Sequence, residues 1–484
     1  MTSQAYLLRC LPLLLFTGLA LFSFLAHFNG LYGQDGHEYL RQSKALFNYW
    51  NTGVLIPGTL GDAEFAKGYP LAGALLNFLL QDPILAMQMV SCLSFAVSAW
   101  LLERILAMLA HGSRADSRWM FVGLGLVLAP IFMRSGLTVM SDALGLALAL
   151  AAFFFGLRWI ENERRSDTVW AAFFIGCAVS VRVGLAGLMI PLALVIGWFL
   201  LERGKWRWMI LAFLAGIVVL SPHFYLKADV LTQPFQHSMM QHWSVANFFQ
   251  RSFQNENGLA QYLLPNGLYL AFPLVHPGFC LLLPGLLLLA KKTDVALPAK
   301  KAIIICLMAY LLLLGGLPHQ NLRFLLPTYA LLLLLLFPAW DRMYCYGFYF
   351  FKRLTWSILG GTFLLQLLAI GWILYPTISR NHLEQSVAQD IRASVSSGAT
   401  VFGFDLDIAM HSYLPDVQFL NLWERRYENF PEGSYVLFNE PALRRQWDGQ
   451  NPMLNWDSLQ ENYVLDTVKS LPEGWMLYLV AGKK

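Results

Sequence analysis

Long apolar runs constrain this chain more than any other feature of its sequence. The runs 10–28, 85–101, 142–157 and 324–340 contain almost no charged residues. Apolar runs of roughly 18 or more residues are typical of membrane-spanning helices. Inside a bilayer every backbone polar group must be hydrogen-bonded within the protein, so these runs predict helices and not strands.

The positions of Lys and Arg predict the orientation of these helices. We expect eleven spans, at about 10–28, 84–102, 119–133, 142–157, 168–181, 183–201, 208–222, 268–290, 302–317, 324–340 and 354–375. A cytoplasmic N-terminus then places seventeen Lys and Arg residues in cytoplasmic segments and eight in outer loops. Cytoplasmic loops carry the excess of these cations. This orientation is therefore favoured, and an odd number of spans places the C-terminus outside.

The composition changes after Pro376, where charges of both signs alternate with apolar residues. Apolar residues four apart predict one helix face, formed by Leu383, Val387, Ile391 and Val395. Short β-branched and aromatic runs predict strands at 401–404, 417–420, 435–438 and 475–480. Asp405 and Asp407 follow the first of these strands and are interpreted as turn-capping residues.

The predicted fold class is a polytopic α-helical membrane protein of about 11 spans with a small C-terminal α/β domain outside the cytoplasm. Residues 1–375 would form the membrane part, with long outer loops at 29–83 and 223–267, and residues 376–484 would form the α/β domain. The outer loops are expected to contain short helices that lie along the membrane surface.

Polar residues at the outer membrane face are the candidates for function. Asp35 follows the first span and could accept a proton from a hydroxyl or an amine. It could equally be a solvated interfacial carboxylate or an N-cap for a helix over 36–47. Lys67 precedes the second span and could bind a lipid phosphate, or its ammonium group could simply extend to the headgroups.

These segments resemble the GT-C superfamily of membrane glycosyltransferases, particularly the protein mannosyltransferase and aminoarabinose (lipid A) transferase branch. The first outer loop carries Asp35, Tyr39, Lys67 and Pro70 in the family's order. Met140-Ser141-Asp142-Ala143-Leu144 resembles the acidic start of the family's fourth helix. His319-Gln320-Asn321-Leu322-Arg323-Phe324-Leu325-Leu326-Pro327 resembles its Arg-aromatic-Leu-x-Pro signature.

The resemblance implies roles for the matching residues. Asp35 would be the catalytic base or would position the acceptor, and Asp142 would support the site from the facing helix. Lys67 and Arg323 would bind the carrier phosphate, with Tyr39 and His319 beside the substrate. Many members of the branch have adjacent Asp and Glu residues, whereas Gly36-His37 separates Asp35 from Glu38 here. Glu38 is therefore a weak catalytic candidate. Asp142 could also be explained as a helix N-cap, together with Ser141.

The implied reaction moves a sugar from a polyprenyl-phosphate carrier to an unknown glycan, lipid or protein acceptor at the outer face of a bacterial inner membrane. No Gly-rich phosphate loop and no nucleic-acid-binding stripe occurs in the sequence. We expect no cofactor, although a divalent metal is not excluded. His237 and His242 are five residues apart, whereas two metal ligands on one helix face are three or four apart, so this pair is not expected to form a metal site.

Two other functions remain open at this point. A transporter or flippase of a lipid-linked sugar would explain the membrane helices, but no internal repeat of the kind common in transporters is evident. A non-catalytic scaffold would tolerate Asp35→Asn and Lys67→Ala.

Overall fold

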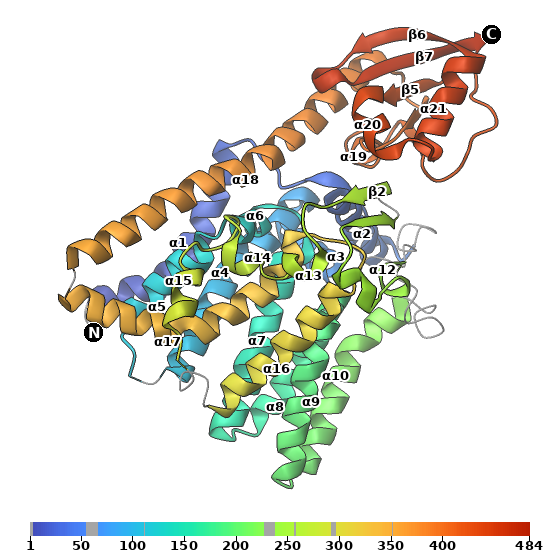
Figure 1. Cartoon of the computed structure of the whole chain (residues 1–484). Coiled ribbons are helices and arrows are strands. Elements are labelled where there is room, and N and C mark those ends of the chain that lie inside the picture. The colour runs from blue at the N-terminus through green and yellow to red at the C-terminus, as the bar shows by residue number, and fades with distance from the viewer. Residues whose placement is uncertain are drawn as a thin grey trace.

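The computed structural model describes residues 3–54, 66–110, 112–226, 238–255, 258–291, 297–350 and 352–484 (Figure 1). His237 lies outside the described residues. The first half of the membrane part contains α1 (Ser3–Leu25), α2 (Gly33–Thr52), α3 (Gly68–Leu80), α4 (Pro83–Leu109), α5 (Ala115–Val122), α6 (Pro130–Leu137), α7 (Ser141–Asn162) and α8 (Ser166–Val181). Its second half contains α9 (Ala186–Glu202), α10 (Trp206–Leu226), α12 (Ser238–Gln241), β1 (Ser252–Asn255), β2 (Gly258–Gln261), α13 (Asn266–Tyr269), α14 (Phe272–Val275), α15 (Leu283–Leu289), α16 (Pro298–Gly315) and α17 (Leu326–Phe350).

Helices that could cross a membrane dominate the described residues. Six are long and apolar enough, and a bent pair of helices makes up to seven. The six are Pro83–Leu109, Ser141–Asn162, Val183–Glu202, Pro298–Gly315, Leu322–Tyr346 and Arg353–Ser394. Shorter apolar helices accompany them at Pro12–Leu25, Gly68–Leu80, Ser166–Val181 and Trp206–Ser221. The chain is thus a multi-pass membrane protein.

Nine of the eleven predicted spans overlap single apolar helices, whereas 119–133 crosses the break between α5 and α6 and 268–290 does not form one helix. The prediction of one span over 268–290 is wrong, because this segment forms the three short helices α13, α14 and α15. Pro273 and Pro284 each lie at the start of one of them, and Pro277 lies between. A proline in a helix interior removes a hydrogen bond and clashes with the preceding turn. The prediction was based on apolar composition alone and did not take these prolines into account.

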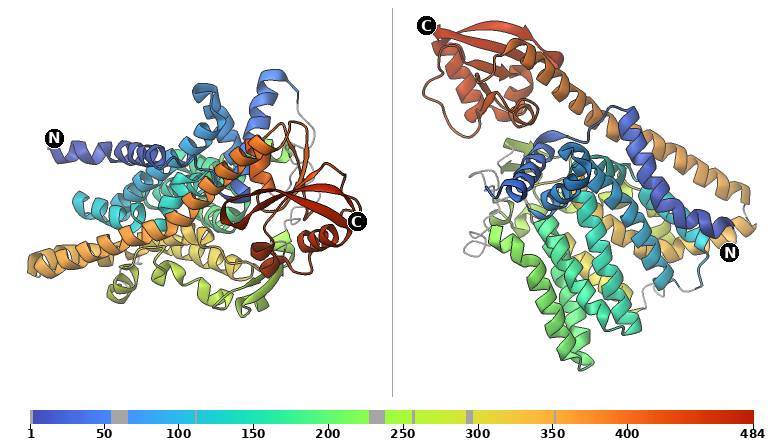
Figure 2. Two further views of the ribbon diagram at one scale, coloured as in Figure 1. Left: turned by 90° about the horizontal axis from the view of Figure 1, so that it is seen from above. Right: turned by 180° about the vertical axis from the view of Figure 1, so that it is seen from behind.

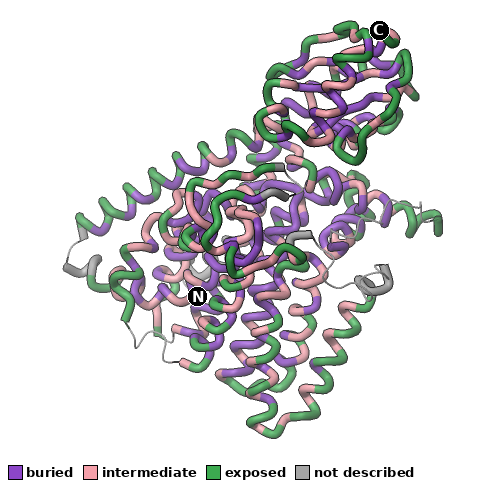
Figure 3. Tube along the Cα trace, turned by 45° about the vertical axis from the view of Figure 1, so that its right-hand side comes forward, coloured by how far each residue is buried: buried purple, intermediate pink, exposed green. Residues whose placement is uncertain are grey.

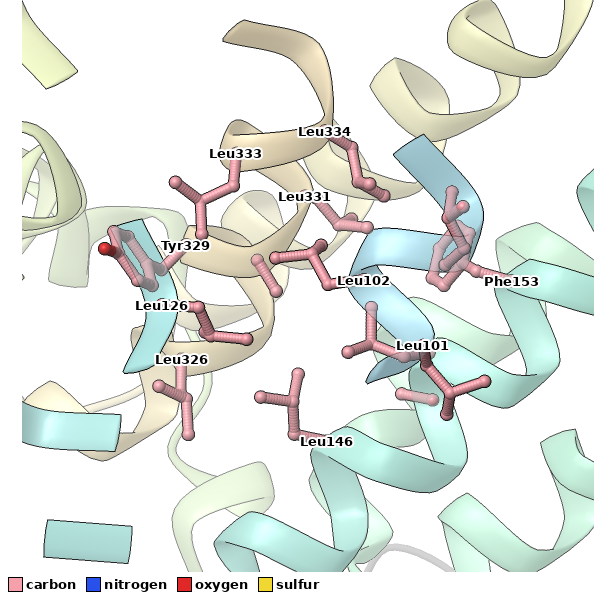
Figure 4. Packing of buried hydrophobic residues seen from close by; sticks show 14 of the residues in the cluster. Leu101, Leu102, Leu126, Leu146, Phe153, Leu326, Tyr329, Leu331, Leu333 and Leu334 are labelled. Atoms are coloured by element: carbon pink, nitrogen blue, oxygen red, sulfur yellow. The ribbon is translucent and has the colours of Figure 1, made fainter. Parts of the chain in front are cut away.

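The centre of the membrane part is formed by α4 and α7, which are largely buried, whereas α9 and α10 expose much of their surface (Figure 3). Figure 4 shows the packing of this core, in which leucines of α4, α7 and α17 interdigitate with Phe153 and Tyr329. The exposed side chains of α9 and α10 include Leu194, Trp198 and Phe213. In a membrane protein such apolar faces meet lipid, so their exposure carries no penalty.

The helix pair Ala115–Val127 and Pro130–Leu137 bends by 73° at a short break. Pro130 opens α6 and lacks a backbone N–H, so the helix cannot continue through it. The carbonyls left open at the break are bonded by other helices: the Gln366 amide donates to the oxygens of Leu124 and Leu128 at 2.9 and 3.3 Å. Tyr329 donates to the Gly125 carbonyl. The bend directs α6 toward the end of the bundle where α2 begins.

The C-terminal domain follows α18 (Lys352–Ser394), a 43-residue helix that runs out of the membrane part (Figures 1 and 2). A five-stranded mixed sheet has the order β4-β3-β5-β7-β6. Its strands are β3 (Thr400–Gly403), β4 (Gln418–Asn421), β5 (Tyr435–Phe438), β6 (Tyr463–Ser470) and β7 (Met476–Lys483), and its helices are α19 (Asp407–Tyr413), α20 (Glu440–Trp447) and α21 (Asn451–Asn462). The four strands expected from the sequence are present, and β6 was not expected.

This domain has its own hydrophobic core, to which the outer end of α18 contributes Leu383, Val387, Ile391 and Val395. The boundary expected at residue 376 therefore falls inside one continuous helix. The domain also contacts two segments of the membrane part, because α19 packs against α2 and α20 packs against β2. Both segments belong to the loops that the sequence predicted to lie outside.

Candidate active site

Asp35 and Arg323 form an ion pair across 288 residues of sequence, with 2.5 Å between Asp35 Oδ2 and Arg323 Nη2. Their side chains are 30% and 20% exposed, so the pair is accessible from outside the bundle. Arg323 also directs Nη1 at Met140 Sδ, 3.3 Å away. Its Nε is buried and has no hydrogen-bond partner among the described residues.

Asp35 owes its position to the start of α2. This helix begins at Gly33, so Asp35 lies in its first turn and is not its N-cap. A carboxylate there is favoured by the positive end of the helix dipole. Gly36 packs its backbone closely on the chain before α7, since a Cβ atom there would lie 3.2 Å from the Val139 carbonyl oxygen. Asp35 is thereby held close to the start of α7.

Lys67 lies against the same helix face. Its Nζ donates to Gln42 Oε1 at 3.1 Å, and Gln42 is seven residues after Asp35, which is two helical turns or roughly 10.5 Å along the axis. The Lys67 side chain is buried, with a residue exposure of 3%. Asp35 and Lys67 are therefore on the same side of the membrane part, as the phosphate-binding hypothesis requires.

Glu38 contacts the residues near Lys67 and not the Asp35–Arg323 ion pair. Its Oε1 accepts from Gln42 at 2.6 Å and from Arg41 at 2.7 Å, and its Oε2 accepts from Arg41 at 2.8 Å. With its charge neutralised by Arg41, Glu38 is placed to orient Gln42 and, through it, Lys67.

Asp142 lies in the first turn of α7 and pairs with Arg182, which follows α8. The alternative interpretation as an N-cap is wrong, because Met140 occupies that position. Arg182 and Arg323 approach the ring of Phe324, with 4.8 and 5.6 Å from each guanidinium carbon to the ring centre. The two ion pairs thus meet at one aromatic ring.

Tyr39 connects α2 to the start of α7, with 3.0 Å between its hydroxyl and Ser141 Oγ. Burial raises the pKa of this phenol above its usual value, and Asp35 adds to the effect. Tyr39 therefore stays neutral and can serve as a hydrogen-bonding group, but not as a negatively charged one.

Arg134 is a further candidate site residue, which the sequence did not single out. It lies in α6 beyond the bend of the helix pair, and its guanidinium carbon is 5.9 Å from the centre of the Tyr32 ring. Tyr32 is the N-cap residue of α2, so Arg134 is close to the start of the helix that carries Asp35. Among the described residues no carboxylate pairs with Arg134. The three arginines Arg134, Arg182 and Arg323 face two carboxylates here.

A signal for Arg134 and Arg182 was present in the sequence. Both were assigned to the outer side, where cations are less common than on the cytoplasmic side. An arginine that departs from this trend next to an apolar segment is a candidate for anion binding. By contrast, Arg118, which pairs with Glu103, and Arg158, which pairs with Asp167, lie toward the opposite ends of the helices.

His319 lies in the loop after α16, with 3.4 Å between its Nδ1 and the Tyr262 hydroxyl. Burial lowers the pKa of His319 to about 4, and the charge of Arg323 contributes. His319 is consequently neutral near pH 7. No group of three or more His, Cys, Asp or Glu side chains among the described residues could hold a metal ion.

Comparison with known proteins gives one kind of match. No protein-family model and no curated protein sequence matches the chain. Two crystal structures of ArnT from Cupriavidus metallidurans do match its fold. The structure bound to undecaprenyl phosphate has a TM-score of 0.65 and 15% sequence identity, with 100% of each chain covered. The apo structure has a TM-score of 0.63 and 15% identity, with 98% of this chain and 99% of that chain covered.

The match extends over the full length, so this chain has the fold of ArnT. The predicted fold class, a polytopic helical membrane protein with a C-terminal α/β domain, is confirmed, with six or seven clear spans and further shorter apolar helices among the described residues. At 15% identity the likeness concerns the fold, and function must be argued from the site.

Proposed function

We propose that this chain is a GT-C glycosyltransferase that moves a sugar from a polyprenyl-phosphate carrier to an acceptor at the outer face of a bacterial inner membrane. The observation that carries the proposal is the Asp35–Arg323 ion pair beside Arg134 and Arg182. A proton acceptor and an excess of positive charge are what this reaction needs at one place. The fold shared with a structure that binds undecaprenyl phosphate adds support.

The arginines would bind the carrier phosphate. Phosphate oxygens accept charge-assisted hydrogen bonds from guanidinium groups, often two at a time. The start of α2 favours the same ligand, because a helix N-terminus attracts anions. Arg134 would contribute a positive charge that no carboxylate among the described residues neutralises. Lys67 would bind the carrier from beside Gln42, two turns after Asp35 on α2.

The acceptor would react by direct displacement. Its hydroxyl or amine attacks the anomeric carbon while Asp35 takes the proton. The bond between the anomeric carbon and the phosphate oxygen breaks, the electron pair leaves with the polyprenyl phosphate, and the configuration inverts. Arg323 stabilises the growing charge on the leaving phosphate, and it also orients Asp35. Asp142 keeps Arg182 in place, while the neutral Tyr39 and His319 bond sugar or acceptor hydroxyls.

The test compares Asp35→Asn with Asp82→Asn. Asp82 caps α4 through hydrogen bonds of 2.9 and 3.0 Å from the backbone of Ile84 and Leu85, and an Asn side chain can make the same bonds. Mass spectrometry of cell-envelope lipids and glycans should show one sugar addition missing in Asp35→Asn and present in Asp82→Asn. Purified Asp35→Asn should still bind undecaprenyl phosphate.

An unchanged glycan profile in Asp35→Asn would overturn the proposal. If the glycan profile is unchanged and Asp35→Asn still transports lipid-linked sugar into proteoliposomes, the transporter alternative is favoured. The orientation is tested separately: alkaline phosphatase fused after Lys484 should be active, because that enzyme folds only outside the cytoplasm.

A further inference from the structure

The C-terminal domain carries an open depression of about 400 Å³ lined by Trp423, Glu424, Gln450 and Asn451. Ligand sites commonly measure roughly 300–1,000 Å³. This depression lies between the loop after β4 and the turn that joins α20 to α21. None of these four residues takes part in the site built around Asp35.

The loop that carries Trp423 is held in one conformation by a buried amide. Asn455, 1% exposed, donates from Nδ2 to the carbonyls of Leu422 and Arg425 at 2.7 and 2.9 Å. Its Oδ1 accepts from the Tyr427 N–H at 2.9 Å. Asn451 ties the loop to the start of α21 by donating to the Trp423 carbonyl at 3.0 Å. The indole is therefore presented by a fixed backbone, which reduces the entropy lost on binding.

The groups around the depression are available to a ligand. Trp423 is 36% exposed, although its domain packs other large aromatic side chains such as Trp456 inside. Among the described residues, the Glu424 carboxylate, the Gln450 amide and the indole N–H have no hydrogen-bond or ion-pair partner. They offer an apolar ring face, a strong acceptor, and a group that both donates and accepts.

We propose that this depression binds a neutral saccharide. A sugar ring has an apolar C–H face that fits the flat indole, and its hydroxyls both donate and accept hydrogen bonds, as the Gln450 amide and the Glu424 carboxylate require. The carboxylate disfavours phosphorylated or carboxylated ligands through like-charge repulsion. The surface is thus unlike the arginine-rich site of the membrane part.

The place of the depression suggests what the saccharide is for. The turn that lines the depression follows α20, and α20 packs on β2 of the hairpin formed by β1 and β2. Just after β2, the Tyr262 hydroxyl accepts from the backbone N–H of Gln320 at 3.1 Å, next to His319. This inference goes beyond the proposed function and does not depend on it. If both hold, the saccharide is part of a glycan acceptor.

The test is saturation-transfer NMR on the full-length protein in phospholipid nanodiscs, free of detergents with sugar headgroups. The probes are methyl glycosides of glucose, galactose, mannose and N-acetylglucosamine, with cyclohexanol as a ring that lacks the hydroxyl pattern. At least one glycoside should receive saturation at its ring C–H protons. Trp423→Ala should weaken that binding by about tenfold or more, since the aromatic face is lost.

Trp206→Ala, which removes another exposed tryptophan, is the matched control and should bind the glycoside normally. Glu424→Ala, at an exposed carboxylate with little structural role, should reproduce the loss if Trp423→Ala does not fold. The proposal is overturned if no glycoside binds, if cyclohexanol binds equally well, or if both depression variants bind like the control. Asp35→Asn should bind the glycoside normally even if it has lost the transferase reaction, so the two proposals are tested independently.

Discussion

Arg134 shows how a single side chain reveals a site. A partly buried guanidinium without a carboxylate partner is costly unless another anion compensates it. The neighbouring arginines have such partners, Asp142 for Arg182 and Asp35 for Arg323. The unbalanced charge is therefore the residue-scale feature that most directly matches a phosphate ligand.

Arg134→Gln should weaken binding of undecaprenyl phosphate by about tenfold or more, because a hydrogen bond to a charged group contributes roughly 1.5–3 kcal/mol. Titration of the purified protein followed by native mass spectrometry measures this. Arg114→Gln is the control, since Arg114 is 68% exposed and pairs with Asp116. Equal affinities of the two variants would remove Arg134 from the phosphate site.

Asp407, interpreted from the sequence as a turn-capping residue, is the first residue of α19 and is 4% exposed. Its Oδ1 has no hydrogen-bond partner among the described residues. Burial raises the pKa of Asp407 from 3.8 to about 7. A raised pKa of an acid means that the folded state binds the proton more tightly than the unfolded state.

The stability that protonated Asp407 contributes is therefore complete below pH 3.8 and is lost as the pH rises to about 7. At about 1.4 kcal/mol per pKa unit, the loss is on the order of a few kcal/mol. Hydrogen exchange of Asp407–Tyr413, corrected for the intrinsic pH dependence, should show protection that falls over this range. Asp407→Asn should remove the dependence, and the exposed Asp416→Asn should keep it. A dependence that survives in Asp407→Asn would contradict this account.

At the scale of elements, close approaches between helix starts place the charged groups. The N-terminus of α3 packs on the end of α8, and the N-terminus of α2 packs on the segment before α7. Glycines permit both approaches, at Gly68 and Gly36. The ends of four helices thereby reach one region, although their apolar faces alone do not specify which ends should meet.

Gly68→Ala should displace α3 and with it Lys67. The added Cβ would lie 2.7 Å from the backbone oxygen of Ser180, which cannot rotate away. Strain of this kind costs roughly 1–3 kcal/mol, and carrier binding should weaken as well. Thermal unfolding and carrier titration measure the two effects. Gly197→Ala in α9 is the control, because nothing lies within 4 Å of its Cβ. A Gly68→Ala protein as stable as this control would refute the prediction.

At the scale of the whole molecule, buried polar contacts attach the C-terminal domain to α2, the helix that carries Asp35. His37 of α2 and Glu384 of α18 have 3.0 Å between Nε2 and Oε2, and both side chains are fully buried. Glu384 also pairs with Arg380, and Arg380 pairs with Asp405 in the domain, both at 2.9 Å. His37 is two residues from Asp35, so the domain and the candidate site share one connected set of contacts.

Glu384→Gln should loosen this attachment. Removing one partner of a buried ion pair costs roughly 3–5 kcal/mol, so hydrogen exchange should rise in both α19 and the start of α2. Limited proteolysis should cut faster near the domain. Glu440→Gln, in a surface pair with Arg444, is the control and should change stability by at most about 1 kcal/mol. Unchanged exchange in α2 would show that the two parts are not coupled through Glu384.

The sequence by itself determined what local patterns can specify. Apolar runs predicted most of the long apolar helices, and the four-residue spacing from Leu383 to Val395 predicted the buried face of α18. Short β-branched and aromatic runs predicted four of the five strands of the C-terminal sheet. The resemblance carried by Asp35, Lys67 and Arg323 indicated the fold. These features depend on neighbours in the chain, so they can be read without the partners.

Only the tertiary structure decided which distant groups meet. The pairs Asp35–Arg323 and Asp142–Arg182 join helix ends, and Arg134 reaches them because its helix pair bends at a proline. Strand β6 forms because β7 lies beside it and bonds its backbone, although its outward residues are largely polar. Such pairings follow from the packing of whole helices and sheets, and the periodicity of any one segment does not contain that information.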